Sequence, residues 1–147
     1  MSVVPSALSK MGFLLDTDVL SESPKPDEAV MDWLDAHDHE AYLSTISLGE
    51  IVKGIELLPA GKRKKEITAW FERLDRWSEN RLLPPTGQVM REWGQLCARH
   101  QRKGRHLPVL GSLIAATALA HNLVLVTRNT GDYPDEVPLL NPWKQGG

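Results

Sequence analysis

Residues 108–120 read PVLGSLIAATALA, an apolar stretch rich in alanine. Small side chains at helical spacing let a helix pack closely against a sheet, so this stretch predicts a buried helix. The strongest strand signal of the chain, Leu123–Thr127, follows at once. The first turn of the predicted helix, where a polar functional residue would be expected, holds Gly111. A helix and a buried strand in direct succession are typical of an α/β fold.

Short apolar runs alternate with helical patterns along the rest of the chain. This alternation predicts a mostly parallel sheet with helices on both faces, a three-layer α/β/α sandwich. The other predicted strands are Gly12–Leu15, Ala41–Ile46, Arg81–Pro84 and Val137–Leu140. The other predicted helices start after a cap at Asp27, run over Leu48–Leu58 after a cap at Ser47, and follow the apolar positions of Ile67–Trp77 and Val89–Cys97.

Length and composition indicate a single domain. A chain of 147 residues, 41% of them hydrophobic and 24% charged, can bury a core of its own. We expect residues 1–11 to form a loosely ordered extension without a functional role, because Pro5 and Ser9 interrupt its apolar residues. Residues 12–147 are expected to form the domain.

Charge and cysteine content limit the partners and the cell compartment that we expect for the protein. The formal net charge of -2 gives no global attraction to nucleic acids or to anionic membranes. The single cysteine, Cys97, cannot form an internal disulfide, and no apolar run is long enough to span a bilayer. We therefore expect a cytoplasmic protein with no membrane partner.

Other motifs of the chain carry weaker signals. Two basic segments, Lys62–Lys65 and Arg99–His106, could bind a nucleic-acid backbone, but runs of charge more often form solvated helix faces or loops. The five histidines show no spacing typical of a metal site. The sequence has neither a phosphate-binding glycine loop nor a Gly-x-Ser-x-Gly motif, so it gives no support for nucleotide hydrolysis or serine-dependent acyl transfer.

Three acidic residues stand where a parallel sheet would bring them together, namely Asp16, Glu50 and Asp132. Clustered carboxylates repel one another unless they share a proton or a cation, and hard oxygen ligands favour Mg²⁺ or Mn²⁺. Each acid also has a purely structural interpretation. Asp16 could end a strand in a turn, Glu50 could be a solvated helix residue, and Asp132 could form a turn.

Four motifs follow one another in the chain, and a short one closes it. They are LLDTDVLSE (14–22), LSTISLGEI (43–51), SLIAATALA (112–120), LVTRNTGDY (125–133) and the closing NPW (141–143). Taken together, from about Phe13 to Trp143, they resemble the PIN-domain family. More narrowly, the chain resembles the VapC/FitB-type toxins of bacterial toxin–antitoxin pairs.

The resemblance implies an endoribonuclease toxin that depends on Mg²⁺ or Mn²⁺. It also implies an RNA substrate, a small VapB-like antitoxin as partner, and a homodimer or toxin–antitoxin hetero-oligomer that reaches DNA only through the antitoxin. By motif match, Asp16 and Glu50 are the first two acids, and the family's last position falls at Asn129 or Asp132. The family's third acid opens the alanine-rich helix, and this chain has Gly111 there.

The glycine predicts an intact fold with an impaired metal site. An aspartate would cap the helix and supply an oxygen, whereas glycine starts a helix at a cost of about a few tenths of a kcal/mol. A hard cation needs several oxygens, so we expect Asp16, Glu50 and Asp132 to hold it poorly and Asn129 to orient a ligand or a water. The chain is then an inactive or weak ribonuclease. A second hypothesis is a catalytically silent module that acts through antitoxin binding and operator regulation.

Overall fold

A computed structural model describes residues 12–20 and 28–142 of the chain. The predicted extension at residues 1–11, the predicted cap Asp27 and the closing Trp143 lie outside the described residues. A single domain spanning residues 12–147 stays a prediction.

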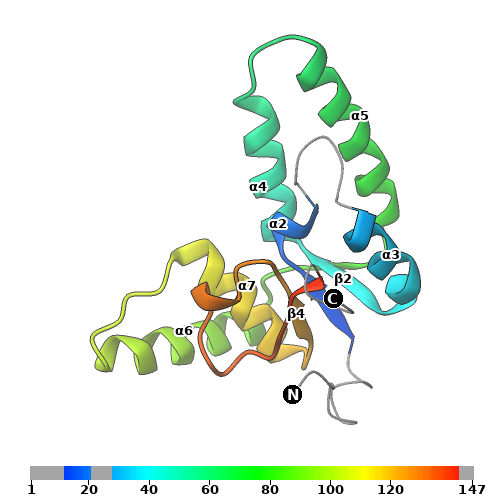
Figure 1. Ribbon diagram of the computed structural model, residues 1–147. Helices are drawn as coiled ribbons and strands as arrows, with labels where there is room; N and C mark the ends of the chain where they lie inside the picture. Colours follow the sequence, from blue (N-terminus) through cyan, green and yellow to red (C-terminus); the bar gives the residue numbers. More distant parts are fainter. Residues whose placement is uncertain (1–11, 21–27, 143–147) are drawn as a thin grey trace.

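Five short strands form one sheet at the centre of the molecule (Figure 1). The strand order is β3-β2-β1-β4-β5, and every neighbouring pair is parallel. The predicted mostly parallel sheet is therefore confirmed. The strands are β1 (Phe13–Leu15), β2 (Ala41–Ser44), β3 (Leu82–Leu83), β4 (Val124–Val126) and β5 (Leu139–Leu140).

The helices gather in two groups around the sheet. Figure 1 shows α4 and α5 as an upright pair at the top of the view, and α6 and α7 at the lower left. The described helices are α2 (Thr17–Leu20), α3 (Glu28–His37), α4 (Thr45–Glu56), α5 (Lys62–Trp77), α6 (Gly87–Arg102) and α7 (Val109–Ala120). Two 3-10 turns, η1 (Asp38–Glu40) and η2 (Thr130–Asp132), complete the described elements.

Two apolar cores, one on each face of the sheet, hold the layers together. Successive side chains of a strand point to opposite faces, so Phe13 and Leu15 of β1 join one core and Leu14 joins the other. The first core includes residues of α3, α4 and α5, and the second includes residues of α6 and α7. This arrangement confirms the predicted three-layer α/β/α sandwich.

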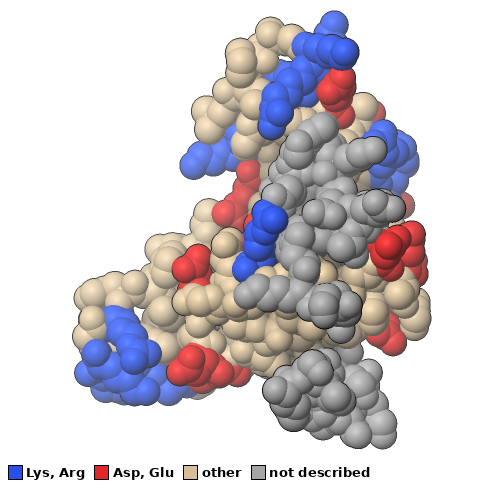
Figure 2. All heavy atoms as spheres, in the orientation of Figure 1, with Lys and Arg blue, Asp and Glu red and all other residues tan. Residues whose placement is uncertain are grey.

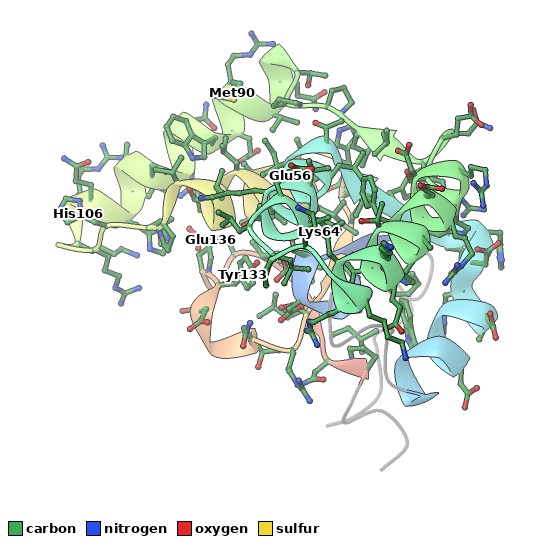
Figure 3. The ribbon with its side chains drawn as sticks, turned by 90° about the horizontal axis from the view of Figure 1, so that it is seen from above. Glu56, Lys64, Met90, His106, Tyr133 and Glu136 are labelled. Carbon is green, nitrogen blue, oxygen red and sulfur yellow. The ribbon has the colours of Figure 1, made fainter. Side chains whose placement is uncertain are left out.

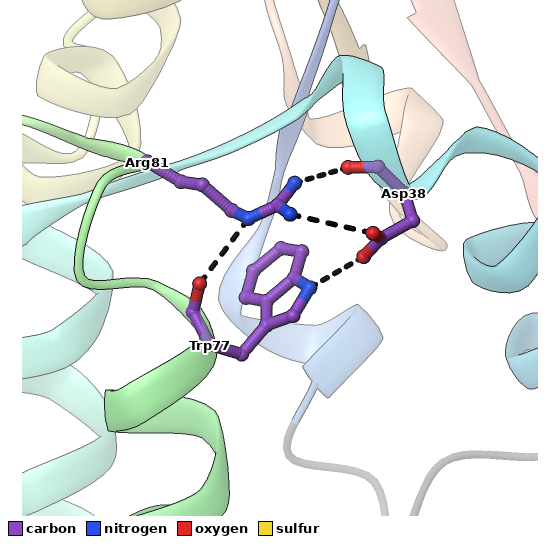
Figure 4. Close-up of polar contacts among 3 residues, drawn as sticks. All are labelled: Asp38, Trp77 and Arg81. Atoms are coloured by element: carbon purple, nitrogen blue, oxygen red, sulfur yellow. Dashed lines mark hydrogen bonds and ion pairs between the residues drawn. The ribbon is translucent and has the colours of Figure 1, made fainter.

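A polar cluster ties the end of α5 to the turn that leads into β2 (Figure 4). Trp77 Nε1 donates a hydrogen bond of 2.5 Å to Asp38 Oδ1, and Arg81 Nη2 lies 3.3 Å from Asp38 Oδ2. Arg81 also donates to the backbone carbonyls of Asp38 and Trp77, and its guanidinium lies 4.5 Å from the centroid of the Trp77 ring. These contacts fix the carboxyl end of α5 beside the sheet.

Helix α4 begins earlier than the sequence pattern predicts. Ser44 caps it, because its Oγ accepts a hydrogen bond of 3.0 Å from the backbone N of Ile46. Strand β2 accordingly ends at Ser44, and the predicted cap at Ser47 is wrong, because Ser47 is buried inside the helix. The earlier start places Glu50 in the second turn of α4.

The first turn of α7 also differs from the prediction. Pro108 is the N-cap and the helix begins at Val109, so Gly111 is its third residue and does not occupy the cap position. An aspartate at 111 would lie near the positive end of the helix dipole without capping the helix. The short helix α2, directly after β1, is a further element that the sequence pattern did not predict.

Leu14 lies fully buried in the central strand. We expect Leu14→Ala to lower the free energy of unfolding by about 2–5 kcal/mol, because the substitution leaves a cavity. Urea denaturation measures the loss. Leu57→Ala is the matched control, because Leu57 is 75% exposed, and it should change the free energy by less than about 0.5 kcal/mol. Similar losses in the two variants would contradict this account of the core.

Candidate active site

Asp16 follows β1 and is buried, with 6% of its surface exposed. A buried carboxylate is costly unless hydrogen bonds satisfy its oxygens. Asp16 Oδ1 accepts a bond of 2.7 Å from the backbone N of Thr17. Asp16 Oδ2 accepts two more, 2.8 Å from Thr127 Oγ1 and 2.5 Å from the Tyr133 hydroxyl. The predicted strand-end acid thus lies at the centre of a polar network.

The register of the sheet explains why these partners meet. Leu15 of β1 pairs with Val126 of β4, so the residues that follow them, Asp16 and Thr127, emerge at the same edge. The backbone N of Asp16 donates to the Val126 carbonyl at 2.9 Å, which continues the ladder to this edge. Sites of open α/β folds form at the carboxyl ends of parallel strands, and this edge is such a place.

Glu50 joins the hydrogen-bond network of Asp16 from helix α4. It is half-buried on α4, and its Oε1 accepts a hydrogen bond of 2.8 Å from Thr17 Oγ1. Thr17 therefore links the two acids, since its backbone N binds Asp16 and its hydroxyl binds Glu50. Glu56, one and a half turns further along, is exposed. The structure thus brings Asp16 and Glu50 to one network through Thr17.

Asp18 is a member of the network that the sequence analysis missed. Its Oδ2 accepts hydrogen bonds of 2.8 Å from Asn129 Nδ2 and 3.3 Å from the Arg128 backbone N, and it lies 3.4 Å from Thr127 Oγ1. These contacts hold the start of the loop after β4 and orient the Asn129 side chain. The signal was present, because Asp18 follows Asp16 by two residues in the first motif.

The remaining predicted positions line a pocket of about 190 Å³ at the head of α7. Asp132 is exposed on η2, and Gly111 faces it from the helix. A Cβ atom built on Gly111 would lie 3.9 Å from Pro108 Cβ and 4.0 Å from Tyr133 Cε1, which is ordinary van der Waals contact. The other residues that line the pocket are Leu107, Pro108, Ser112, Asn129, Tyr133 and Pro134.

The residues of the site do not fit a divalent cation as they stand. Within residues 12–20 and 28–142, no three His, Cys, Asp or Glu side chains are grouped so that they could hold a metal. Asp16 Oδ2 already accepts two hydroxyl hydrogen bonds, and Gly111 has no side-chain oxygen to offer. A hard cation needs several oxygens at close range, and this arrangement does not supply them.

Tyr133 was not among the predicted site residues, although it closes the fourth motif. Burial raises the pKa of its phenol, and the negative charge of Asp16 and the hydrogen bond to Asp16 raise it further. Asp18 and Glu50 add to the same effect. The Tyr133 hydroxyl therefore keeps its proton and acts as a hydrogen-bond donor to Asp16.

An ion pair anchors the loop that carries Tyr133. Buried His100 on α6 places Nε2 3.0 Å from Glu136 Oε1, and Arg99 Nε lies 3.3 Å from Glu136 Oε2. Figure 3 shows Tyr133 and Glu136 on the loop that follows β4, and His106 at the outer end of the α6–α7 connection. The loop is thus fastened to α6 three residues beyond Tyr133.

The two predicted basic segments lie at opposite ends of the molecule. Lys62–Lys65 begins α5, where Lys62 Nζ lies 4.0 Å from Glu66 Oε1. The other segment forms the tip between α6 and α7, where Arg102, Lys103 and Arg105 are exposed; Figure 2 shows this positive cluster at the lower left. Because Leu107 and Pro108 line the pocket, the tip leads directly to its rim.

Comparison with known proteins settles the family. The PIN domain family matches the chain over residues 13–134. The chain belongs to the PIN domain family. Toxin FitB of Neisseria gonorrhoeae is 36% identical over 138 residues, which cover 88% of this chain and 97% of FitB. The VapC ribonuclease Y4jK of Sinorhizobium fredii is 34% identical over 139 residues, which cover 89% of this chain and 97% of that relative.

The solved structures agree with this placement among the PIN domains. The structure of FitAB bound to an IR36 DNA fragment matches with a TM-score of 0.80 and 31% identity, over 92% of this chain and 98% of the other. The resemblance to VapC/FitB-type toxins is therefore confirmed, and VapC proteins of this family are generally ribonucleases. The roles assigned to Asp16, Glu50, Asn129, Asp132 and Gly111 stay predictions.

Thr127→Val tests the hydrogen bonds that hold Asp16. The substitution keeps the shape of the side chain but removes a donor from a buried carboxylate, so the free energy of unfolding should fall by about 1–3 kcal/mol. Thr117→Val is the matched control, because Thr117 is equally buried but its hydroxyl donates to the Leu113 carbonyl within α7. Urea denaturation of both variants should give the larger loss for Thr127→Val, and the reverse order would contradict the network.

The Glu136 ion pair predicts a dependence of stability on pH. Burial by itself would raise the pKa of Glu136, but hydrogen bonds from His100, the residue's own backbone and Arg99, with the charge of His100, outweigh it and lower the pKa. A carboxyl with a lowered pKa in the folded state stabilises the fold above its unfolded pKa. That contribution is lost as the pH falls through the folded pKa.

Glu136→Gln should therefore be less stable than the original chain at pH 7, and the two should converge as the pH falls below about 4. Thermal unfolding between pH 3 and pH 8 measures the difference, with Glu79→Gln, at an exposed glutamate, as the control. A difference that persists unchanged at pH 3 would show that the ion pair is not its cause.

Proposed function

We propose that this PIN domain is the toxin-side member of a toxin–antitoxin pair, with a ribonuclease site that is impaired because Gly111 stands in place of the third acid. The observation that carries the proposal is the space at the head of α7. A side chain at 111 would enter a pocket lined by Asn129, Asp132 and Tyr133, and its Cβ would meet only ordinary contacts. The position can therefore accept a carboxylate without rebuilding the fold.

The resemblance implies Mg²⁺ or Mn²⁺ as the cofactor, with RNA as the substrate. Asp16, Glu50 and Asp132 are the proposed ligands, and Asn129, held by Asp18, is proposed to orient one of them or a water. Among the described residues these side chains are not grouped so that they could hold a metal, so we propose no more than weak ribonuclease activity for the chain itself. An aspartate at 111 would return the missing carboxylate to the same pocket.

The charge distribution supports an RNA substrate. Although the net charge is -2, the exposed cations Arg102, Lys103 and Arg105 lie together at the tip beside the pocket. A local positive patch attracts phosphate backbones even when the whole protein is slightly acidic. We propose that this tip, rather than Lys62–Lys65, meets the RNA, because Leu107 and Pro108 connect it to the rim of the pocket.

The proposed partner is a VapB-like antitoxin. The relative FitB is a toxin, and a FitAB complex has been solved on a DNA fragment. By analogy, this chain would form a homodimer or a toxin–antitoxin hetero-oligomer and would reach DNA only through the antitoxin. No helix among the described residues is long and apolar enough to cross a membrane. A cytoplasmic location is part of the same proposal.

A second candidate function is a catalytically silent module that acts through its antitoxin in an operator-bound complex. The DNA-bound FitAB structure favours this alternative, because regulation of that kind needs no cation site. A gene for a small DNA-binding protein directly upstream would support a partner under both functions. Restored ribonuclease activity would favour the first function over the second.

Gly111→Asp should raise RNA cleavage in the presence of Mg²⁺ or Mn²⁺ by at least about tenfold, because it returns a ligand to a site that lacks one. The free energy of unfolding should change by less than about 1 kcal/mol, since glycine is a poor helix former and an acid in the first turn is favourable. Cleavage of a fluorescent RNA by protein made in cell-free synthesis measures the gain, and toxicity on induction in cells is a second readout.

Gly94→Asp is the matched control for the added charge. Gly94 is an exposed glycine within α6, and a Cβ there would meet nothing within 4 Å. This variant should cleave no more RNA than the original chain. If Gly111→Asp folds correctly and gains no activity, Gly111 is not a vacated acid and the silent module becomes the better proposal.

A further inference from the structure

The strongest unexplained feature of the site is the Tyr133 hydroxyl, which lies 2.5 Å from Asp16 Oδ2. We propose that Tyr133 acts as a plug: its hydroxyl occupies the position on Asp16 that a cation would need, and its ring borders the space that an acid at 111 would fill. The inference rests on the proposed function, in which Gly111 is a vacated acid. It predicts that the residues at positions 111 and 133 together decide whether a cation can bind Asp16.

Tyr133 covers one carboxylate oxygen of Asp16, Oδ2. Asp16 is 6% exposed, so few directions of approach to its carboxylate remain. The inner donor to Oδ2, Thr127, belongs to the sheet edge, and the Thr17 backbone N takes Oδ1. Tyr133 lines the pocket at the head of α7, whereas Asp16 does not. A cation that binds Asp16 Oδ2 from the pocket must therefore displace the phenol.

The ring of Tyr133 leaves room for a side chain at position 111. Tyr133 Cε1 lies 4.0 Å from the Cβ position at Gly111, in contact range without a clash. A side chain at 111 would therefore begin beside this ring, within the pocket that both residues line. The plug and a restored acid can coexist sterically, so Gly111→Asp alone is compatible with folding while the hydroxyl still competes for Asp16.

Contacts on both sides of Tyr133 hold its loop in place. Pro134, the next residue, is buried, and Glu136 is fastened to His100 and Arg99 of α6. On the other side, Asp132 N donates to the Asn129 carbonyl at 3.1 Å within η2. The loop is thus held on both sides of Tyr133. These contacts therefore fix the position of the Tyr133 hydroxyl.

The test compares Mn²⁺ binding in the Gly111→Asp background with and without the hydroxyl. Tyr133→Phe should tighten Mn²⁺ binding by about tenfold, because the cation no longer competes with a hydrogen bond to a charged group. Isothermal titration calorimetry of the full chain with MnCl₂ measures the affinity. Tyr42→Phe is the matched control, since Tyr42 on β2 is the other tyrosine of the chain, and it should change the affinity by less than about twofold.

Unchanged or weaker Mn²⁺ binding in the folded Tyr133→Phe variant would overturn the proposal, because a residue with a merely structural role would weaken the site. Circular dichroism checks folding, and Tyr133→Leu, which also lacks the hydroxyl, should tighten binding in the same direction. If Tyr133→Phe fails to fold, weaker or equal binding by Tyr133→Leu overturns the proposal instead.

RNA cleavage is measured separately, so that the two proposals fail separately. Tighter Mn²⁺ binding without any gain in cleavage would support the plug and overturn the ribonuclease assignment. A gain in cleavage on Gly111→Asp, with Mn²⁺ affinity that Tyr133→Phe leaves unchanged, would support the ribonuclease assignment and overturn the plug.

Discussion

A buried carboxylate needs hydrogen-bond donors. The arrangement of this PIN domain depends on how it supplies them to Asp16. One donor is the next backbone amide, one is a hydroxyl at the end of the neighbouring strand, and one is a phenol from the loop beyond. The three donors come from parts of the chain that only the parallel sheet brings together. Asp16 therefore links the carboxyl ends of β1 and β4 to the loop that forms one wall of the pocket.

The fold and the chemistry of the site depend on different faces of the same helix. Ile114, Ala115 and Ala118 hold α7 against the sheet, and Ser112 accepts a hydrogen bond of 2.9 Å from Trp93 Nε1 of α6. None of these contacts uses position 111, whose missing side chain would point into the pocket. A chain can therefore lose an acid there and keep every contact that packs the helix. The packing of α7 in this PIN domain is therefore independent of the side chain at 111.

The layers of the fold could be predicted from the sequence because each depends on a local pattern. The apolar run before Asp16 and the alanine-rich stretch after Gly111 both indicate buried elements by composition alone. Element ends were less predictable, since Ser44 and Ser47 are equally good caps in sequence and only the end of β2 selects Ser44.

Residues of the site could be predicted only where they follow the end of a strand. Asp16 and Glu50 were found because a strand or a strand–helix junction precedes each of them, although their proposed role as ligands rested on resemblance. The contact between Asp16 and Tyr133 joins residues that are 117 positions apart, and Tyr133 sits in a loop without periodicity. No local pattern specifies which way such a side chain turns, so the residue that covers the acid became visible only in three dimensions.

The strand order affects when the protein can fold during its synthesis. β1 is synthesised early, but its neighbour β4 lies near the other end of the chain, and the hydrogen bond between Asp16 and Thr127 closes a separation of 111 residues. Contacts of such long range form late and slowly, because the intervening chain must be ordered before they are gained. A nascent or truncated chain that stops before β4 has Asp16 but no partner strand for it. This topology therefore delays assembly of the hydrogen bonds around Asp16 until β4 and the loop after it have been made.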